Sequence, residues 1–115
     1  HIMLACINGT LNEIAIEWHD GYCSTVVCAS PGYPESYPKG LVISGVDLAD
    51  DVMVFHAGTA WDGQSLTTQG GRVLCVTALG DSVKVAQSRA YEAVAQICFD
   101  GMQFRRDIGA KGLRY

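Results

Sequence analysis

The sequence predicts an α+β fold in which a mainly antiparallel sheet or half-barrel packs against one main helix. Short apolar segments rich in β-branched residues follow one another with turn signals between them, which favours antiparallel pairing of neighbouring strands. Only one long segment, residues 82–97, has apolar residues at steps of three and four. The chain has 115 residues, of which 49% are hydrophobic, so one domain can form a core without disulfides or metal.

The first part of the sequence predicts a short helix that follows residues foreign to the domain. Residues 1–3 resemble what remains of an expression tag, so the domain itself is predicted over residues 4–115. Three apolar residues then have helical spacing: Leu4, Ile7 and Leu11. A helix that begins so abruptly suggests a piece cut from a longer protein. Residues 13–18 alternate loosely and are either a strand or an irregular lead-in.

The next part of the chain predicts two strands on either side of a long loop. Residues 24–29 are rich in β-branched side chains and predict a buried strand. Residues 31–40 predict a shaped loop, because proline fixes φ and glycine permits positive φ. This loop either faces a ligand or is a long ordered connection. Residues 41–43 predict a short strand ending at Gly45, and the acidic residues 47–51 predict one helical turn.

A hairpin predicted over residues 54–78 is the centre of the domain. Residues 52–55 and 73–76 are predicted to be its buried strands, with a turn at Asp62-Gly63. The polar ends of these strands carry the candidate site residues, which are His56, Gly58, Thr59, Gly70, Gly71 and Arg72. Glycines beside one arginine suit a place where backbone amides and a guanidinium approach an anion. The alternative is an ordinary hairpin whose glycines serve turns.

The last part of the chain predicts the main helix and a basic segment. Asp81 or Ser82 is predicted to cap the helix over residues 82–97, whose apolar stripe is assigned to the core. Cys98-Phe99 predicts a further strand or an extended segment. The segment Arg105-Arg106-Asp107 either holds a phosphate or pairs with another domain, or it is a solvated ion-pair cluster.

Charge and cysteine usage narrow the class of function. A net charge of −4 argues against a general nucleic-acid surface, and the apolar runs are far short of a membrane span. No signal peptide opens the sequence. The five cysteines form no C-x-x-C pair, and four lie in apolar runs, which predicts buried free thiols in a reducing cytosol. The histidines, including His19 beside Trp18, do not have the spacing of a metal site.

Five segments, taken together and in order, resemble a known family. They are V-V-C-A-S-P-G-Y-P-E-S-Y-P-K-G at 26–40, V-F-H-A-G-T-A at 54–60, G-G-R-V-L-C-V-T-A-L-G at 70–80, A-Q-S-R-A-Y-E-A-V at 86–94 and R-R-D-I-G at 105–109. From about residue 4 the chain is similar to the C-terminal domain of phosphoribosylamine–glycine ligase, also called glycinamide ribonucleotide synthetase. It departs from the family at Glu35, where glycine is common, and in the tail at 110–115.

The resemblance implies a fold, an activity and partners. The implied fold is a rudimentary barrel-sandwich hybrid. The implied enzyme is an ATP-grasp ligase of purine biosynthesis. That cytoplasmic enzyme joins glycine to phosphoribosylamine, using ATP and magnesium or manganese, through a glycyl phosphate. The ATP and the metal belong to N, A and B regions, and nothing in this sequence resembles those regions. This chain is therefore expected to close one side of the substrate cleft and to be inactive alone.

The resemblance also implies roles for the candidate residues. Arg72, with Gly70 and Gly71, is expected to meet the phosphoribosyl substrate, because the planar guanidinium bonds two phosphate oxygens together. The other expected cleft residues are His56, Gly58 and Thr59. No residue of this chain is assigned a catalytic or metal-binding role. The alternative is a free-standing module that binds a small ligand or a protein. A biotin or lipoate carrier would need a lysine at the hairpin tip, and Asp62-Gly63 has none.

Overall fold

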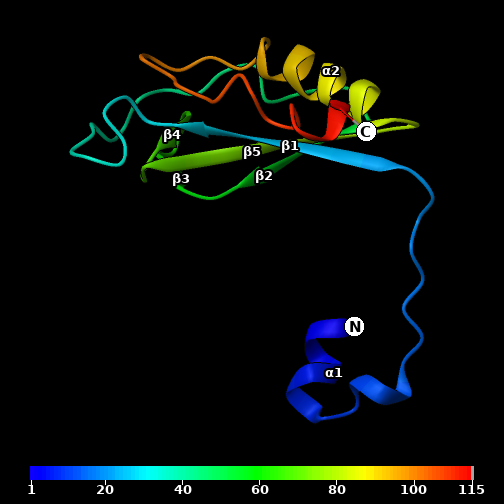
Figure 1. The fold of residues 1–115 in the computed structure, drawn as a ribbon. Coiled ribbons are helices and arrows are strands. Elements are labelled where there is room, and N and C mark those ends of the chain that lie inside the picture. The colour runs from blue at the N-terminus through cyan, green and yellow to red at the C-terminus, as the bar shows by residue number, and fades with distance from the viewer. Residues whose placement is uncertain (115) are drawn as a thin grey trace.

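A computed structural model describes residues 1–114 (Figure 1). Tyr115, the last residue of the domain predicted over 4–115, lies outside the described residues. The helices are α1 (Ile2–Asn8), η1 (Leu11–Glu13, 3₁₀), α2 (Val83–Val94) and η2 (Gly112–Arg114, 3₁₀). The strands are β1 (Tyr22–Ala29), β2 (Val52–His56), β3 (Thr59–Trp61), β4 (Leu66–Thr68) and β5 (Arg72–Gly80).

Two small antiparallel sheets form the body of the protein. Strand β5 is the centre of a three-stranded sheet with the order β1-β5-β2, and β3 and β4 form a separate two-stranded hairpin. Helix α2 covers one side of the larger sheet, as Figure 1 shows. Val26, Val76 and Val54 are paired across the three strands. Val26 and Val76 are fully buried in the core that α2 completes. The predicted α+β class, an antiparallel sheet on one main helix, is confirmed.

Helix α2 begins where the sequence predicts and ends earlier. The Ser82 hydroxyl accepts a hydrogen bond from the Val85 backbone N–H at 3.2 Å, which confirms the N-cap. Alanines at the buried positions of α2 bring its backbone close to the sheet; the buried residues are Ala86, Ala90, Ala93 and Val94. The helix ends at Val94, although residues up to 97 were predicted to be helical. Ile97 is still buried, because the chain leaves the helix alongside the core.

Two predictions between residues 41 and 51 are wrong. Residues 41–43 form no strand and make only an isolated bridge, because Gly40 and Gly45 take positive φ and turn the chain at both ends. Residues 47–51 form no helical turn, and a tight turn precedes β2 instead. The aspartates in that segment would lie three and four residues apart on a helix, where like charges repel.

The predicted burial of the cysteines is wrong for all but one of them. All five thiols are free, as predicted, but only Cys28 is buried; Cys75 is half-buried and the other three are exposed. Cys23 and Cys75 lie on the side of the sheet opposite α2, which no other layer of the described chain covers. Burial chiefly, and the nearby Cys75, raise the pKa of the Cys28 thiol to about 11.

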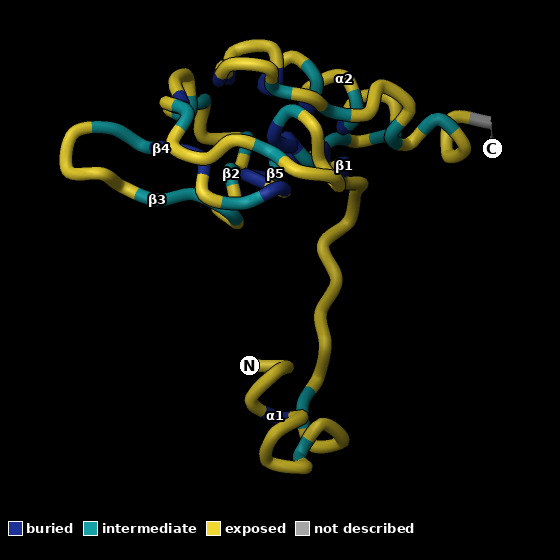
Figure 2. Tube along the Cα trace, turned by 90° about the vertical axis from the view of Figure 1, so that its left-hand side faces the viewer, coloured by how far each residue is buried: buried dark blue, intermediate teal, exposed yellow. Residues whose placement is uncertain are grey.

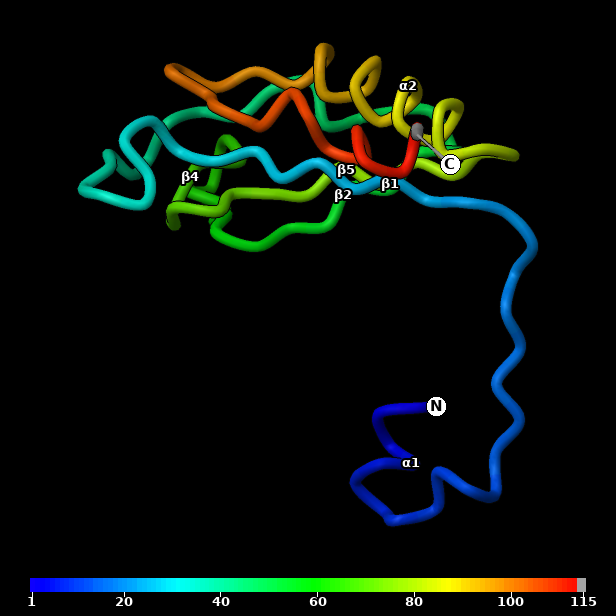
Figure 3. Tube along the Cα trace, viewed as in Figure 1, coloured from blue at the N-terminus to red at the C-terminus, as the bar shows by residue number. Residues whose placement is uncertain are grey.

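The N-terminal arm, residues 1–21, stands apart from the sheet. Helix α1 packs against η1, and residues 14–21 then run in an extended, irregular path to β1 (Figure 3). Most of the arm is exposed, as the colouring in Figure 2 shows, and Ala5 is the one buried residue within α1. No helix within residues 1–114 is long and apolar enough to cross a membrane.

Candidate functional site

Gly58 and Gly70 lie where the chain crosses between the larger sheet and the β3-β4 hairpin. The Gly58 N–H donates to the Arg72 carbonyl at 2.9 Å, and the N–H groups of Gln69 and Gly70 donate to the Gly58 carbonyl at 2.7 and 3.1 Å. A Cβ on Gly58 would lie 2.6 Å from the Gly70 Cα. Backbone atoms leave no room for a Cβ on Gly58, and a Cβ on Gly70 would lie 3.0 Å from the Gly58 Cα, so both glycines have a structural role.

Gly71 lies against the loop at 31–40. A Cβ on Gly71 would overlap the ring of Tyr33, so only glycine leaves room for that ring. Ser30 fixes the start of the loop, because its N–H donates to the Gly71 carbonyl at 2.8 Å and its hydroxyl donates to the Gly70 carbonyl at 2.9 Å. Gly70 and Gly71 therefore hold the loop at 31–40 against the start of β5. The loop in turn brings Tyr33 beside Arg72.

A cavity of about 490 Å³ opens where β1, this loop, the start of β5 and residues 103–105 meet. Its lining residues are Val27, Ala29, Tyr33, Pro34, Arg72, Gln103, Phe104 and Arg105. Two arginines, Arg72 and Arg105, thus lie among aromatic and apolar residues around a hollow that is open to solvent. Such a set of donors suits an anion, and arginine in particular binds the oxygens of a phosphate in pairs.

Residues 103–105 are held in place by contacts from distant parts of the chain. The backbones of Ala29 and Gln103 exchange two hydrogen bonds of 2.8 and 3.0 Å. The Gln103 side-chain amide donates to the carbonyls of Ser30 and Tyr33 at 2.9 and 3.0 Å. The Tyr91 hydroxyl donates to the Arg105 carbonyl at 2.7 Å. Gln103, which lines the cavity, therefore links the loop at 31–40 to the C-terminal segment by hydrogen bonds.

The two arginines of the cavity differ in their partners. Arg105 makes two hydrogen bonds, of 2.9 and 2.7 Å, to the Asp107 carboxylate. This contact lowers the pKa of Asp107 and raises the pKa of Arg105. The ion pair predicted as one reading of this segment is therefore present, on the exposed surface. Within residues 1–114 the salt bridges are Arg105–Asp107 and Arg89–Asp51, so the charge of Arg72 is free to meet a ligand.

The six candidate residues fall into two groups. Arg72 lines the cavity, with Gly70 and Gly71 directly before it. His56 and Thr59 lie where the chain passes from β2 to β3 and contact each other, Nδ1 to Oγ1, at 3.1 Å. They do not line the cavity, because β1 and β2 flank opposite edges of β5. Gly58 joins the two groups only through its backbone contacts with Gly70 and Arg72.

Sequence reasoning missed most of the residues around Arg72. Tyr33 and Pro34 fall in the loop whose composition allowed a ligand-facing role, and Arg105 was considered for a phosphate. Gln103 carries no local signal, since its position follows from pairing with Ala29, far away in the sequence. Magnesium takes oxygen ligands, chiefly carboxylates, and the cavity offers guanidinium groups instead. The metal implied for the longer ligase does not fit this cavity.

The fold and the cavity define a class of protein: a small α+β domain with two antiparallel sheets, one main helix and a hollow lined by two arginines. Residues 23–111 match the family model described as phosphoribosylglycinamide synthetase, C domain. The chain belongs to this family, as its sequence motifs predicted.

Several known proteins are similar to this chain. A phosphoribosylamine–glycine ligase of Synechocystis is 48% identical over 115 residues, which cover 97% of this chain and 27% of the relative. A bifunctional purine biosynthetic protein of Dictyostelium discoideum is 43% identical, over 99% of this chain and 14% of the relative. The crystal structure of the Thermotoga maritima ligase matches with a TM-score of 0.75 and 31% identity, over 91% of this chain and 27% of that one. The chain thus spans about a quarter or less of these relatives.

Proposed function

We propose that this chain is the C-terminal domain of a phosphoribosylamine–glycine ligase. The full-length enzyme joins glycine to 5-phosphoribosylamine with ATP, giving glycinamide ribonucleotide, ADP and phosphate in de novo purine biosynthesis in the cytoplasm. The family match over residues 23–111 supports this proposal. The missing N, A and B regions supply the sites for ATP and for magnesium or manganese, so this domain has no activity by itself.

At the level of residues, the cavity beside Arg72 is the observation that supports this proposal. Arg72 binds the 5-phosphate of the ribonucleotide, and the ring of Tyr33 with Pro34 forms the adjacent wall. Arg105 adds a second cation whose charge Asp107 partly offsets. His56, Gly58 and Thr59 lie beyond the cavity and meet the substrate only if the cleft extends past the hairpin crossing.

Replacing Arg72 in the full-length ligase tests this assignment. Arg72→Ala is expected to lower kcat/KM for phosphoribosylamine at least about tenfold, since a charge-assisted hydrogen bond contributes roughly 1.5–3 kcal/mol. Steady-state kinetics of product formation measure the effect. The matched control is Arg89→Ala, which removes an arginine on α2 that does not line the cavity, and its kcat/KM is expected to stay within about twofold. Kinetics of Arg72→Ala indistinguishable from wild type would remove this residue from the site.

A further inference from the structure

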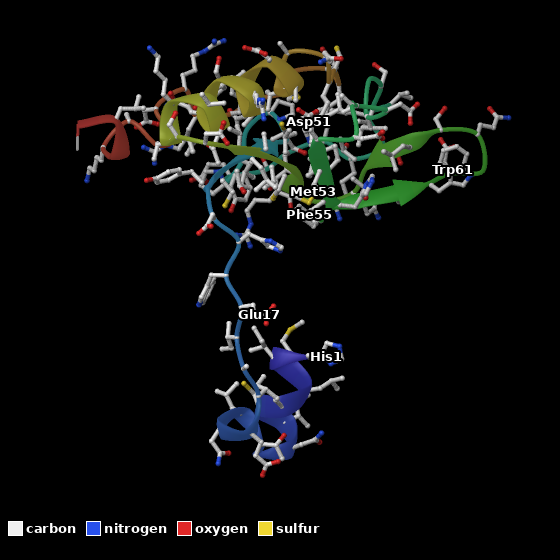
Figure 4. The ribbon with its side chains drawn as sticks, turned by 90° about the vertical axis from the view of Figure 1, so that its right-hand side faces the viewer. His1, Glu17, Asp51, Met53, Phe55 and Trp61 are labelled. Atoms are coloured by element: carbon white, nitrogen blue, oxygen red, sulfur yellow. The ribbon has the colours of Figure 1, made fainter. Side chains whose placement is uncertain are left out.

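Residues 104–112 return along helix α2 after the helix has ended, as Figure 1 and Figure 4 show. Three side chains of α2 contact them in turn. The Tyr91 hydroxyl bonds to the Ile108 N–H at 3.1 Å, the Gln87 side-chain amide donates to the Ile108 carbonyl at 2.5 Å, and Val83 lies beside η2. Residues four apart on a helix share one face, so α2 presents a row of contacts that fixes the path of residues 104–112.

The Tyr91 hydroxyl makes two hydrogen bonds around a charged bend. It donates to the Arg105 carbonyl at 2.7 Å and accepts from the Ile108 N–H at 3.1 Å. In many four-residue turns the carbonyl of the first residue bonds directly to the N–H of the fourth. Here the hydroxyl bridges these two groups, since it has both a donor and acceptor lone pairs. One oxygen atom of α2 therefore fixes the bend that carries Arg106 and Asp107.

The fixed bend also holds the second arginine of the cavity. Arg105 lines the cavity, and its guanidinium bonds to the Asp107 carboxylate at 2.9 and 2.7 Å. Both residues of this pair lie within the stretch that the Tyr91 hydroxyl bridges. An exposed ion pair of this kind has little stability by itself, because two long side chains must be held in one geometry. The bridge supplies part of that restraint from the backbone.

The ring of Tyr91 has a separate contact. It packs against Phe104, which lines the cavity, with 6.2 Å between the ring centroids. The guanidinium carbon of Arg106 lies over the same Phe104 ring, 5.1 Å from its centroid. Tyr91 itself does not line the cavity. Replacing it with phenylalanine therefore removes the hydroxyl bridge and keeps the ring that supports the cavity wall.

We propose that Tyr91 is a positioning residue for the substrate phosphate, and that its hydroxyl acts through Arg105. The inference rests on the proposed function, in which Arg72 and Arg105 line the phosphate-binding cavity. A flexible side chain loses conformational freedom when it binds a ligand, and this cost is smaller where the group is already held in place. The bridge from α2 holds the Arg105 backbone where its guanidinium can meet the phosphate.

Tyr91→Phe in the full-length ligase tests this role by steady-state kinetics. The KM for phosphoribosylamine is expected to rise at least about fivefold, with the KM values for glycine and ATP within about twofold of wild type. A purely structural loss would reduce the amount of folded enzyme, and so would lower kcat and leave all three KM values unchanged. The matched control is Tyr22→Phe, at an exposed tyrosine of β1 that does not line the cavity, for which all three KM values should stay within about twofold.

A double-mutant cycle shows whether Tyr91 acts through Arg105. In the Arg105→Ala background, Tyr91→Phe is expected to change the KM for phosphoribosylamine by less than about twofold, because the residue through which it acts is absent. In the Arg72→Ala background it should still raise this KM at least about fivefold, since Arg72 lies on β5 and outside the bend.

Four outcomes would overturn the positioning role. These are an unchanged KM for phosphoribosylamine in Tyr91→Phe, a lower kcat with all three KM values unchanged, an equal rise in all three KM values, or additive effects of Tyr91→Phe and Arg105→Ala. Arg72→Ala separates this inference from the proposed function. Weaker use of phosphoribosylamine by Arg72→Ala beside unchanged Tyr91→Phe kinetics overturns the positioning role alone. Wild-type kinetics in both Arg72→Ala and Arg105→Ala overturn the phosphate site itself.

Discussion

Arg72 and Arg105 are two arginines of one cavity with different electrostatic surroundings. The Arg105 guanidinium is bonded to the Asp107 carboxylate, and Arg72 has no acidic partner among residues 1–114. A ligand phosphate would compete with Asp107 for Arg105 but would meet Arg72 directly. Arg72 is therefore the residue whose loss should weaken anion binding most.

The buried thiol of Cys28 makes the stability of the domain depend on pH. Burial raises its thiol pKa from 9.0 to about 11, so the folded state keeps this proton where the unfolded state loses it. Stability is therefore unaffected below about pH 9 and falls as the pH rises towards 11. By pH 11 the loss is about 2 kcal/mol.

Urea unfolding of wild type and Cys28→Ala between pH 8 and 11 measures this effect. The two proteins share every other residue, so the difference between the two curves isolates Cys28. The free energy of unfolding of wild type should fall more steeply above pH 9. Parallel curves over the whole range would contradict the buried, protonated thiol.

At the residue scale, the sequence indicated the arginine that lines the cavity and not the residues around it. Arg72 is singled out because two glycines precede it in a short polar stretch. Tyr33 packs on Gly71, and the Gln103 amide reaches Ser30, 73 residues earlier in the chain. Neither contact leaves a periodic pattern, since each depends on how distant segments fold together.

At the element scale, the crossing at Gly58 connects the hairpin β3-β4 to the larger sheet. The φ of Gly58 lies outside the left-handed region, so it is space rather than backbone conformation that requires glycine there. A Cβ would lie 2.8 Å from the Arg72 carbonyl oxygen, and backbone on both sides leaves little room for relief. The crossing therefore fixes where β5 begins and, with it, Arg72.

Gly58→Ala should destabilise the domain by about 2–3 kcal/mol, because overpacking forces the backbone to shift. Gly63→Ala is the matched control at the hairpin tip. It has no atom within 4 Å of an added Cβ, but its φ of +99° leaves a strain cost of about 1 kcal/mol. Chemical denaturation compares the two variants. Equal losses of stability would show that the crossing has room for a methyl group.

Elements with strong local signals were predicted well, and short ones were not. The β-branched runs of β1 and β5 and the apolar stripe of α2 all formed as predicted. Strands β3 and β4 were missed, because each has only three residues and pairing in the hairpin, not propensity, defines them. The end of α2 was placed too late because buried Ile97 continues the apolar stripe beyond the helix.

At the scale of the whole molecule, the wrong prediction for the cysteines has a physical meaning. Continuous apolar runs such as 73–76 are typical of strands buried on both faces. Within residues 1–114 helix α2 packs on one side of this sheet, while on the other side Val73 and Thr77 are buried, Cys75 is half-buried and Cys23 is exposed. The α+β class and the family were predictable from the motifs. The uncovered face was not, since the pattern of β5 is that of a strand covered on both sides.

We propose that this domain completes a ligase that it cannot operate alone. The most direct test supplies ATP, glycine and phosphoribosylamine to this chain and, separately, to the full-length polypeptide that contains it, and measures ADP and glycinamide ribonucleotide. Both products are expected from the full-length polypeptide and neither from the 115-residue chain. Turnover by the isolated chain, or a full-length polypeptide that forms no glycinamide ribonucleotide, would contradict it.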